Sequence, residues 1–242
     1  MSFKMNFYGA ILQAKIENKK LLAVLLDPDK LDETSLDKTI EKINTSPATH
    51  ILVGGSTYCG NSLDVFVLNL KANTNLPVFL FPGNYKQISN EADGILFLSL
   101  MSGRNPDYLV EHQIKAVPFL EKSRLEVMPT AYLLIESGAE TAVERVSKTS
   151  PIARTDVKLV CQTAKAGEYL GQQLVYLEAG SGAQQVVPYE MIQAVSQKLT
   201  IPLIVGGGIR SKKGIDAAFN AGADMVVIGT AFENDNTFFE SC

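Results

Sequence analysis

The residues best suited to chemistry lie near the C-terminal end of the chain. Residues 201–230 contain two apolar runs that each stop at glycine, the first at the three glycines 206–208 and the second at Gly229, which Thr230 follows. Glycine lets backbone N–H groups approach a bound anion closely, and a helix N-terminus behind such a loop adds a positive dipole. This pattern predicts a phosphate site at one edge of a parallel sheet. The alternative is that the glycines only punctuate the strand ends.

Side chains that favour a metal ion follow two earlier apolar runs. Asp27 comes directly after residues 21–26, and Ser56 follows shortly after residues 50–53. A carboxylate beside a hydroxyl and water forms an all-oxygen environment, which suits Mg²⁺. We therefore interpret Asp27 and Ser56 as metal contacts. Asp-Pro-Asp at the first position also fits a plain turn and helix cap.

Glu178 ends another apolar run and opens a glycine-rich loop. We expect it opposite the two phosphate loops. A lone carboxylate there repels phosphate, so a hydroxyl group or a proton is its better partner. As a general base it needs a raised pKa, which burial supplies. The alternative is a structural carboxylate that binds loop N–H groups. We assign His50 and His112 to structure, because the sequence shows no partner for either.

The elements that must position these residues are short apolar runs with helix-forming segments between them. Continuous runs rich in Leu, Val and Ile are typical of parallel strands covered on both faces by helices. We expect strands at residues 21–26, 50–53, 77–80, 94–98, 127–135 (in part), 174–177, 201–205 and 225–228. Helices are expected at residues 31–44, 107–118 and 156–170, while residues 141–150 remain unassigned. Eight alternating units predict one (β/α)8 barrel domain over residues 1–242, with the phosphate site after strands seven and eight.

Composition narrows the function classes. A net charge of −4 without a basic run weighs against a nucleic-acid partner. No apolar stretch reaches the roughly 18 residues that span a membrane, and the N-terminus does not read as a signal peptide. Cys59, Cys161 and Cys242 are widely spaced and without a CxxC motif, so we expect free thiols and a cytoplasmic protein.

The motifs together resemble a known family. They are LLDPDK (25–30), VGGST (53–57), SGRNPDYL (102–109), EVMPTAYLL (126–134), YLEAGSGA (176–183), VGGGIRS (205–211) and VVIGTAFE (226–233). In this order the chain resembles the geranylgeranylglyceryl phosphate synthases, (β/α)8 prenyltransferases also called the PcrB-like family. A subset of that family has Lys where this chain has Leu25, so the chain is similar to the archaeal-type subgroup.

The resemblance implies an activity and a set of roles. The family joins sn-glycerol 1-phosphate to a polyprenyl diphosphate, usually geranylgeranyl diphosphate, and releases diphosphate. By resemblance, Asp27 and Ser56 bind Mg²⁺, and Glu178 orients or deprotonates the attacking hydroxyl. The glycerol phosphate contacts implied are Tyr176, Leu177, Glu178, Ala179, Gly180, Ser181 and Gly182, with Gly207, Gly208, Gly229 and Thr230 as the phosphate cradle. The resemblance also implies a homo-oligomer, a dimer or hexamer, with at most peripheral membrane contact. Arg104 and Lys30 are candidate helpers at the diphosphate.

Other functions share part of this pattern. A sugar-phosphate isomerase barrel has the same glycines but usually an acid–base pair across the barrel. An aldolase needs a Schiff-base lysine at the end of a middle strand, where this chain has Glu178. A non-catalytic phosphate-binding barrel would not need Asp27, Ser56 and Glu178 together.

Overall fold

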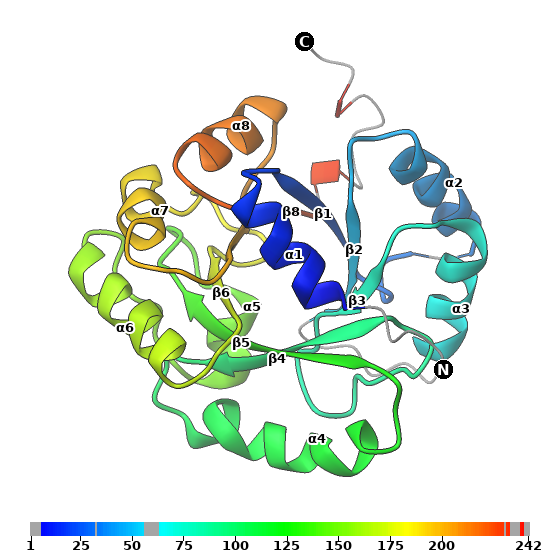
Figure 1. The fold of residues 1–242 in the computed structure, drawn as a ribbon, viewed down its shortest axis with the longest axis horizontal. Helices are drawn as coiled ribbons and strands as arrows, with labels where there is room; N and C mark the ends of the chain where they lie inside the picture. The colour runs from blue at the N-terminus through cyan, green and yellow to red at the C-terminus, as the bar shows by residue number, and fades with distance from the viewer. Residues whose placement is uncertain (1–5, 32, 56–62, 230, 233–237, 240–242) are drawn as a thin grey trace.

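The described part of the chain forms a closed barrel of eight parallel strands in sequence order (Figure 1). This computed structural model describes residues 6–31, 33–55, 63–229, 231–232 and 238–239. The strands are β1 (Leu21–Leu26), β2 (His50–Val53), β3 (Val78–Leu80), β4 (Gly94–Leu100), β5 (Glu126–Leu134), β6 (Leu174–Glu178), β7 (Leu203–Gly206) and β8 (Met225–Ile228). Strand β1 pairs with β8 as well as with β2, which closes the barrel and confirms the predicted fold class.

Helices cover most of the outer face of the barrel (Figure 1). They are α1 (Phe7–Ile16), α2 (Glu33–Asn44), α3 (Leu63–Asn73), the π-helix η1 (Asp107–Glu111), α4 (His112–Leu120), α5 (Ala142–Ser147), α6 (Val157–Tyr169), α7 (Tyr189–Ser196) and α8 (Lys212–Asn220). Helix α1 differs from the others because it lies across the barrel's N-terminal end.

Side chains alternate between two cores, as β6 illustrates. Leu174 and Tyr176 belong to the cluster inside the barrel, whereas Val175 and Leu177 belong to the cluster between strands and helices. Residues two apart on a strand share a face. Glu178 therefore faces the barrel interior, one layer above Tyr176 and at the C-terminal edge of the sheet.

Several element boundaries differ from the prediction, and proline explains two of them. Strands β3 and β7 begin after Pro77 and Pro202, since proline has no N–H for a strand ladder. Pro118 does not end a helix but lies inside α4, and the predicted helix there begins as a π-helix. Asp156 caps α6, with its carboxylate accepting from the Leu159 N–H at 2.9 Å.

The unassigned segment 141–150 contains a short helix. Thr141 accepts from the Glu144 N–H, and the Glu144 carboxylate accepts from the Thr141 N–H at 2.8 Å. This reciprocal capping box satisfies helix N–H groups that have no intrahelical partner. It explains why six residues form the helix α5 on the C-terminal side of the barrel.

The connection between β3 and β4 lacks a helix. In a regular barrel a helix follows every strand, but the described residues 81–93, which connect β3 to β4, contain no helix. Gln87 holds this loop, accepting from the Gly83 N–H at 2.7 Å and donating to the Gly55 carbonyl at 3.1 Å. The loop therefore has a fixed path, and the space of the missing helix is available to other groups.

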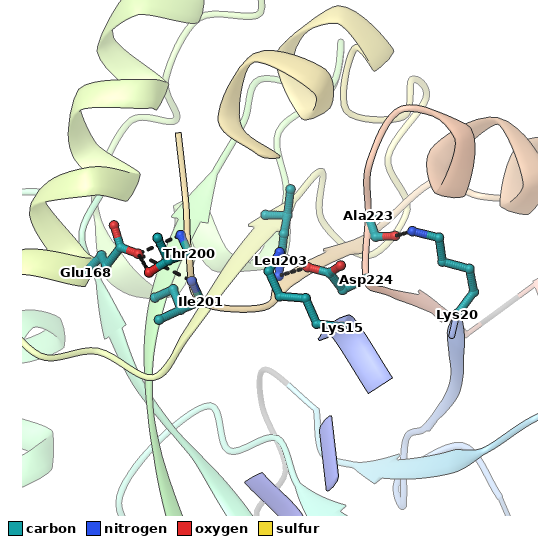
Figure 2. Close-up of polar contacts among 8 residues, drawn as sticks. All are labelled: Lys15, Lys20, Glu168, Thr200, Ile201, Leu203, Ala223 and Asp224. Carbon is teal, nitrogen blue, oxygen red and sulfur yellow. Dashed lines mark hydrogen bonds and ion pairs between the residues drawn. The ribbon is translucent and has the colours of Figure 1, made fainter. Parts of the chain in front are cut away.

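Polar contacts secure the N-terminal edge of the barrel (Figure 2). The Asp224 carboxylate accepts from the Leu203 N–H at 2.9 Å and pairs with Lys15 of α1 at 2.8 Å. Nearby, Glu168 accepts from the N–H and hydroxyl of Thr200 at 2.7 and 2.6 Å. These contacts tie α1, α6 and the approach to β7 together, which leaves the opposite edge free for chemistry.

Candidate functional site

A cavity of about 740 Å³ opens at the C-terminal ends of the strands. One half is polar and is lined by the loops after β6, β7 and β8 together with Asp27. The other half is apolar. We call its wall residues Phe97, Leu98, Tyr108, Ala116, Val143 and Val146 the apolar slot. The two halves are continuous, so the cavity can hold a charged group at one end and an apolar group at the other.

Glycine shapes the polar half. Gly207 and Gly208 follow β7 with positive φ angles of 84° and 71°, and Gly180 and Gly182 follow β6 with φ angles of 100° and 81°. Residues other than glycine rarely adopt this backbone conformation. A Cβ at Gly207 would lie 2.3 Å from a Glu178 carboxylate oxygen. The two loops therefore pack against each other through their backbones, and their shape requires glycine.

Gly229 is different. Its φ angle is not among the positive ones, and among the described residues a Cβ there would meet nothing closer than the Leu25 carbonyl oxygen at 3.5 Å. The described neighbours therefore leave room for a side chain at this position. Gly229 lines the cavity, so glycine here keeps the backbone accessible to a bound group.

Glu178 lies at the centre of the site. Only 5% of its surface is exposed, and its carboxylate accepts from the Gly180 N–H at 2.5 Å. Burial raises the pKa of Glu178 to about 7, although Gly180 and the nearby Tyr176 hydroxyl lower it in part. Near neutral pH the side chain therefore exists in both protonation states, which is the range in which a general base works best.

Tyr176 packs beneath Glu178 in an aromatic layer. Its ring stacks on Phe81 with centroids 5.3 Å apart, and Tyr132 lies 5.5 Å from it. Burial raises the pKa of both tyrosines well above the usual range, and the Glu178 charge adds to this. The Tyr176 hydroxyl lies near enough to Glu178 to lower the pKa of that carboxyl, but it makes no hydrogen bond of ordinary geometry to any described group. A Cβ at Gly206 would lie 2.2 Å from that hydroxyl, so glycine there makes room for the tyrosine.

Asp27 lies across the cavity from Glu178, after β1. Its carboxylate accepts from the Asp29 N–H at 3.2 Å and pairs with Lys30 at 3.0 Å. Asp27 thus forms the turn that the sequence offered as the alternative to a metal contact. The turn does not exclude a metal role, since Asp27 also lines the cavity. A Cβ at Gly55 would lie 2.7 Å from this carboxylate, so glycine leaves one side of it open.

Among the described residues, no group of three or more His, Cys, Asp or Glu side chains could enclose a metal ion. Ser56, the other expected contact, lies outside the described residues. Mg²⁺ commonly binds through one or two carboxylates, water and substrate phosphates. The open Asp27 carboxylate fits that second kind of site.

Basic side chains line the cavity from three different connections between strands. They are Lys30 after β1, Arg145 on α5 and Arg210 after β7. Arg210 donates to the Ala183 carbonyl at 2.8 Å, which links the β7 loop to the β6 loop. Sequence reasoning proposed only Lys30 of these three. Arg104, the other proposed helper, lies instead in a separate surface pocket with Lys148.

The structure brings most of the expected site residues together. Asp27, Tyr176, Glu178, Gly180, Ser181, Gly182, Gly207, Gly208 and Gly229 all line the cavity. The side chains of Leu177 and Ala179 do not, because they face the outer core. Thr230 lies outside the described residues.

The two histidines have different places. His50 is buried at the start of β2, and desolvation lowers its pKa to about 4, which fits the structural role. His112 instead lines the cavity, at the junction of η1 and α4. The prediction that His112 has only a structural role therefore misses its place in the cavity wall.

No described helix has the length and hydropathy that crossing a membrane requires.

Comparison with known proteins gives consistent matches. A model of the PcrB family matches residues 14–241. A geranylgeranylglyceryl phosphate synthase of Flavobacterium johnsoniae is 59% identical over 231 residues, covering 96% of this chain and 95% of the relative. One of Zunongwangia profunda is 55% identical over 225 residues, covering 93% and 96%. The crystal structure of the Thermoplasma acidophilum (S)-3-O-geranylgeranylglyceryl phosphate synthase with sn-glycerol-1-phosphate superposes with a TM-score of 0.92 at 37% identity, covering 98% and 95%.

Proposed function

Because the chain belongs to the PcrB family, we propose that it joins sn-glycerol 1-phosphate to a polyprenyl diphosphate. The observation that carries this proposal is the division of one cavity into a glycine-lined polar half and an apolar slot, with Glu178 buried between them. The two substrates need opposite surroundings, and the two halves of the cavity match them. A glycerol phosphate needs N–H groups and cations, whereas a prenyl tail needs a dry apolar wall.

The acceptor phosphate lies in the polar half. The loops after β6 and β7 present backbone N–H groups, and Arg210 stands beside them. Gly229 lets the phosphate approach the backbone after β8, where the described neighbours leave room for a side chain. This arrangement leaves the glycerol hydroxyl directed at Glu178, which faces the barrel interior.

Glu178 then acts as base or as orienting group. The hydroxyl oxygen forms a bond to the allylic carbon, the bond from that carbon to the diphosphate oxygen breaks, and the hydroxyl proton moves to the Glu178 carboxylate. With a pKa of about 7, the carboxylate can accept this proton near neutral pH. The rings of Phe81, Tyr132 and Tyr176 lie beneath it and exclude water from the reacting atoms.

The leaving diphosphate needs charge neutralisation. Asp27 would hold Mg²⁺ there with Ser56, and the ion would act as a Lewis acid on the diphosphate when bound. Lys30, after β1, and Arg145, on α5, add positive charge. We keep geranylgeranyl diphosphate as the donor, and a cytoplasmic homo-oligomer (a dimer or hexamer) with at most peripheral membrane contact, as proposals from the family resemblance.

The rival functions fit less well. An isomerase or a non-catalytic phosphate barrel has no use for an apolar slot that continues from the phosphate loops. The test is transfer itself. Purified protein, Mg²⁺, labelled sn-glycerol 1-phosphate and geranylgeranyl diphosphate are incubated, and both organic-extractable label and released diphosphate are measured. sn-Glycerol 3-phosphate serves as the control acceptor. If neither product forms, the proposal fails.

A further inference from the structure

Two aromatic rings meet across the apolar slot. Tyr85 belongs to the loop 81–93 that replaces a helix, and His112 begins α4 on the opposite wall. Their ring centroids lie 5.7 Å apart with the planes 27° from parallel, so the rings are stacked. Both residues line the cavity. The space of the missing helix is therefore bridged by a side-chain contact.

Each wall is held in place independently of this contact. Gln87 anchors the Tyr85 loop to Gly55. On the other wall, the Tyr108 hydroxyl donates to the Val146 carbonyl at 3.0 Å, and the Tyr108 ring meets His112 edge-on at 4.7 Å. The backbone on each side of the slot is thus held by contacts of its own, and the two rings are the groups that meet between the walls.

The His112 ring is uncharged and weakly held, so its stack on Tyr85 is apolar and can separate. Desolvation lowers the pKa of its ring, and this outweighs the opposing effect of the Asp107 carboxylate. The ring is therefore neutral at physiological pH. Its Nδ1 atom is buried without a hydrogen-bond partner among the described groups. An unpaired buried nitrogen costs stability, so no hydrogen bond at Nδ1 stabilises the stacked position.

We propose that the Tyr85–His112 pair closes the far end of the apolar slot and so determines the longest prenyl chain that binds. This inference rests on the proposed function. A tail that ends before the rings leaves the stack intact, whereas a longer tail must separate them and loses their contact. In an apolar pocket, a misfit of one methylene changes selectivity by about 10- to 200-fold. An additional isoprene unit therefore meets strong discrimination.

The test compares donors of fifteen, twenty, twenty-five and thirty carbons with wild type, His112→Ala and Tyr85→Ala. We expect each variant to raise kcat/KM for the longer donors, relative to the twenty-carbon donor, by at least about tenfold. His112→Phe keeps a ring and should keep the wild-type length profile. Ile114→Ala is the matched control, since Ile114 lies on the same helix, is 58% exposed and does not line the cavity.

The outcomes separate the two proposals. Calorimetric binding of the same diphosphates is measured in parallel, and circular dichroism checks that each variant is folded. If wild type transfers no donor, the proposed function fails, and the binding profile still tests the closure. If both alanine variants transfer the twenty-carbon donor with an unchanged length profile, the closure is overturned while the function stands. An equal shift in Ile114→Ala would also overturn it.

Discussion

Replacing Glu178 by glutamine removes a proton-binding group while it keeps the shape of the side chain. The amide oxygen can still accept from the Gly180 N–H, which lies 2.5 Å from the carboxylate. The amide cannot ionise, and it cannot take a proton from an acceptor hydroxyl. The substitution therefore affects stability and turnover in opposite directions if Glu178 is a buried base.

The stability change follows from the pKa. Burial raises the pKa of Glu178 from 4.5 to about 7. Between these values the unfolded chain has released a proton that the native protein still holds, so this group makes native stability fall as pH rises. At about 1.4 kcal/mol for each unit of pKa, the loss approaches about 3 kcal/mol above pH 7. Glu178→Gln has no such loss. We expect it to match wild type below pH 4.5 and to exceed it by up to about 3 kcal/mol above pH 7.

Two measurements on the same preparations test this reasoning. Urea unfolding at several pH values from 4.5 to 8 gives the difference in free energy of unfolding between the two proteins. Steady-state transfer gives kcat, which we expect to fall by about 10²- to 10⁴-fold, the range for a positioned base. The wild-type kcat/KM should rise with pH around 7. A variant that is less stable at pH 8 and retains its kcat would refute the catalytic role and return Glu178 to a structural one.

Three further predictions concern other parts of the site and the fold. EDTA should abolish transfer and Mg²⁺ restore it, and Asp27→Asn should lose most turnover with an unchanged melting temperature; full activity in EDTA would contradict the metal role. Gly229→Ala should raise KM for glycerol phosphate without loss of stability, and an unchanged KM would place the phosphate elsewhere. Gly207→Val should lower both stability and kcat because its side chain would displace Glu178. His50, with its pKa lowered to about 4, should contribute up to about 3 kcal/mol that is complete above pH 6.5 and lost as pH falls toward 4; an NMR titration midpoint above 6 would contradict this.

The barrel could be predicted because its strands carry their own signal. A run such as residues 174–177 is apolar at every position, since both faces of β6 are buried. Residues that directly follow such runs, including Asp27 and Glu178, could be placed at the C-terminal edge for the same reason. Period-two alternation also separates Tyr176, which lines the cavity, from Leu177, which does not. Alternation along the strand is enough to make that distinction. The family resemblance did not make it, because it assigned substrate contacts to Tyr176 and Leu177 alike.

The rest of the site depends on approaches between distant segments. Arg145 reaches the cavity because the Thr141–Glu144 capping box starts a helix within a stretch that has no long apolar period. The stack of Tyr85 on His112 joins residues from the β3–β4 and β4–β5 connections, and no local sequence pattern predicts that they meet. An unpaired buried nitrogen is likewise invisible in a sequence. Such features arise from tertiary packing, so single-sequence reasoning has no periodicity or spacing with which to find them.

The departure from regular barrel geometry explains how one fold serves two dissimilar ligands. Strands β6 to β8 keep the usual glycine loops, which offer backbone N–H groups and suit a small phosphate. A long apolar tail needs length that the mouth of a barrel does not offer, and a complete ring of helices would block its exit. Without a helix between β3 and β4, residues of the loop 81–93 and of α4 line the same cavity. Glu178 lies where the polar and apolar halves meet, and burial at that boundary is also what raises its pKa. Under the proposed function, the same arrangement separates the two substrates and raises the pKa of the group proposed to act between them.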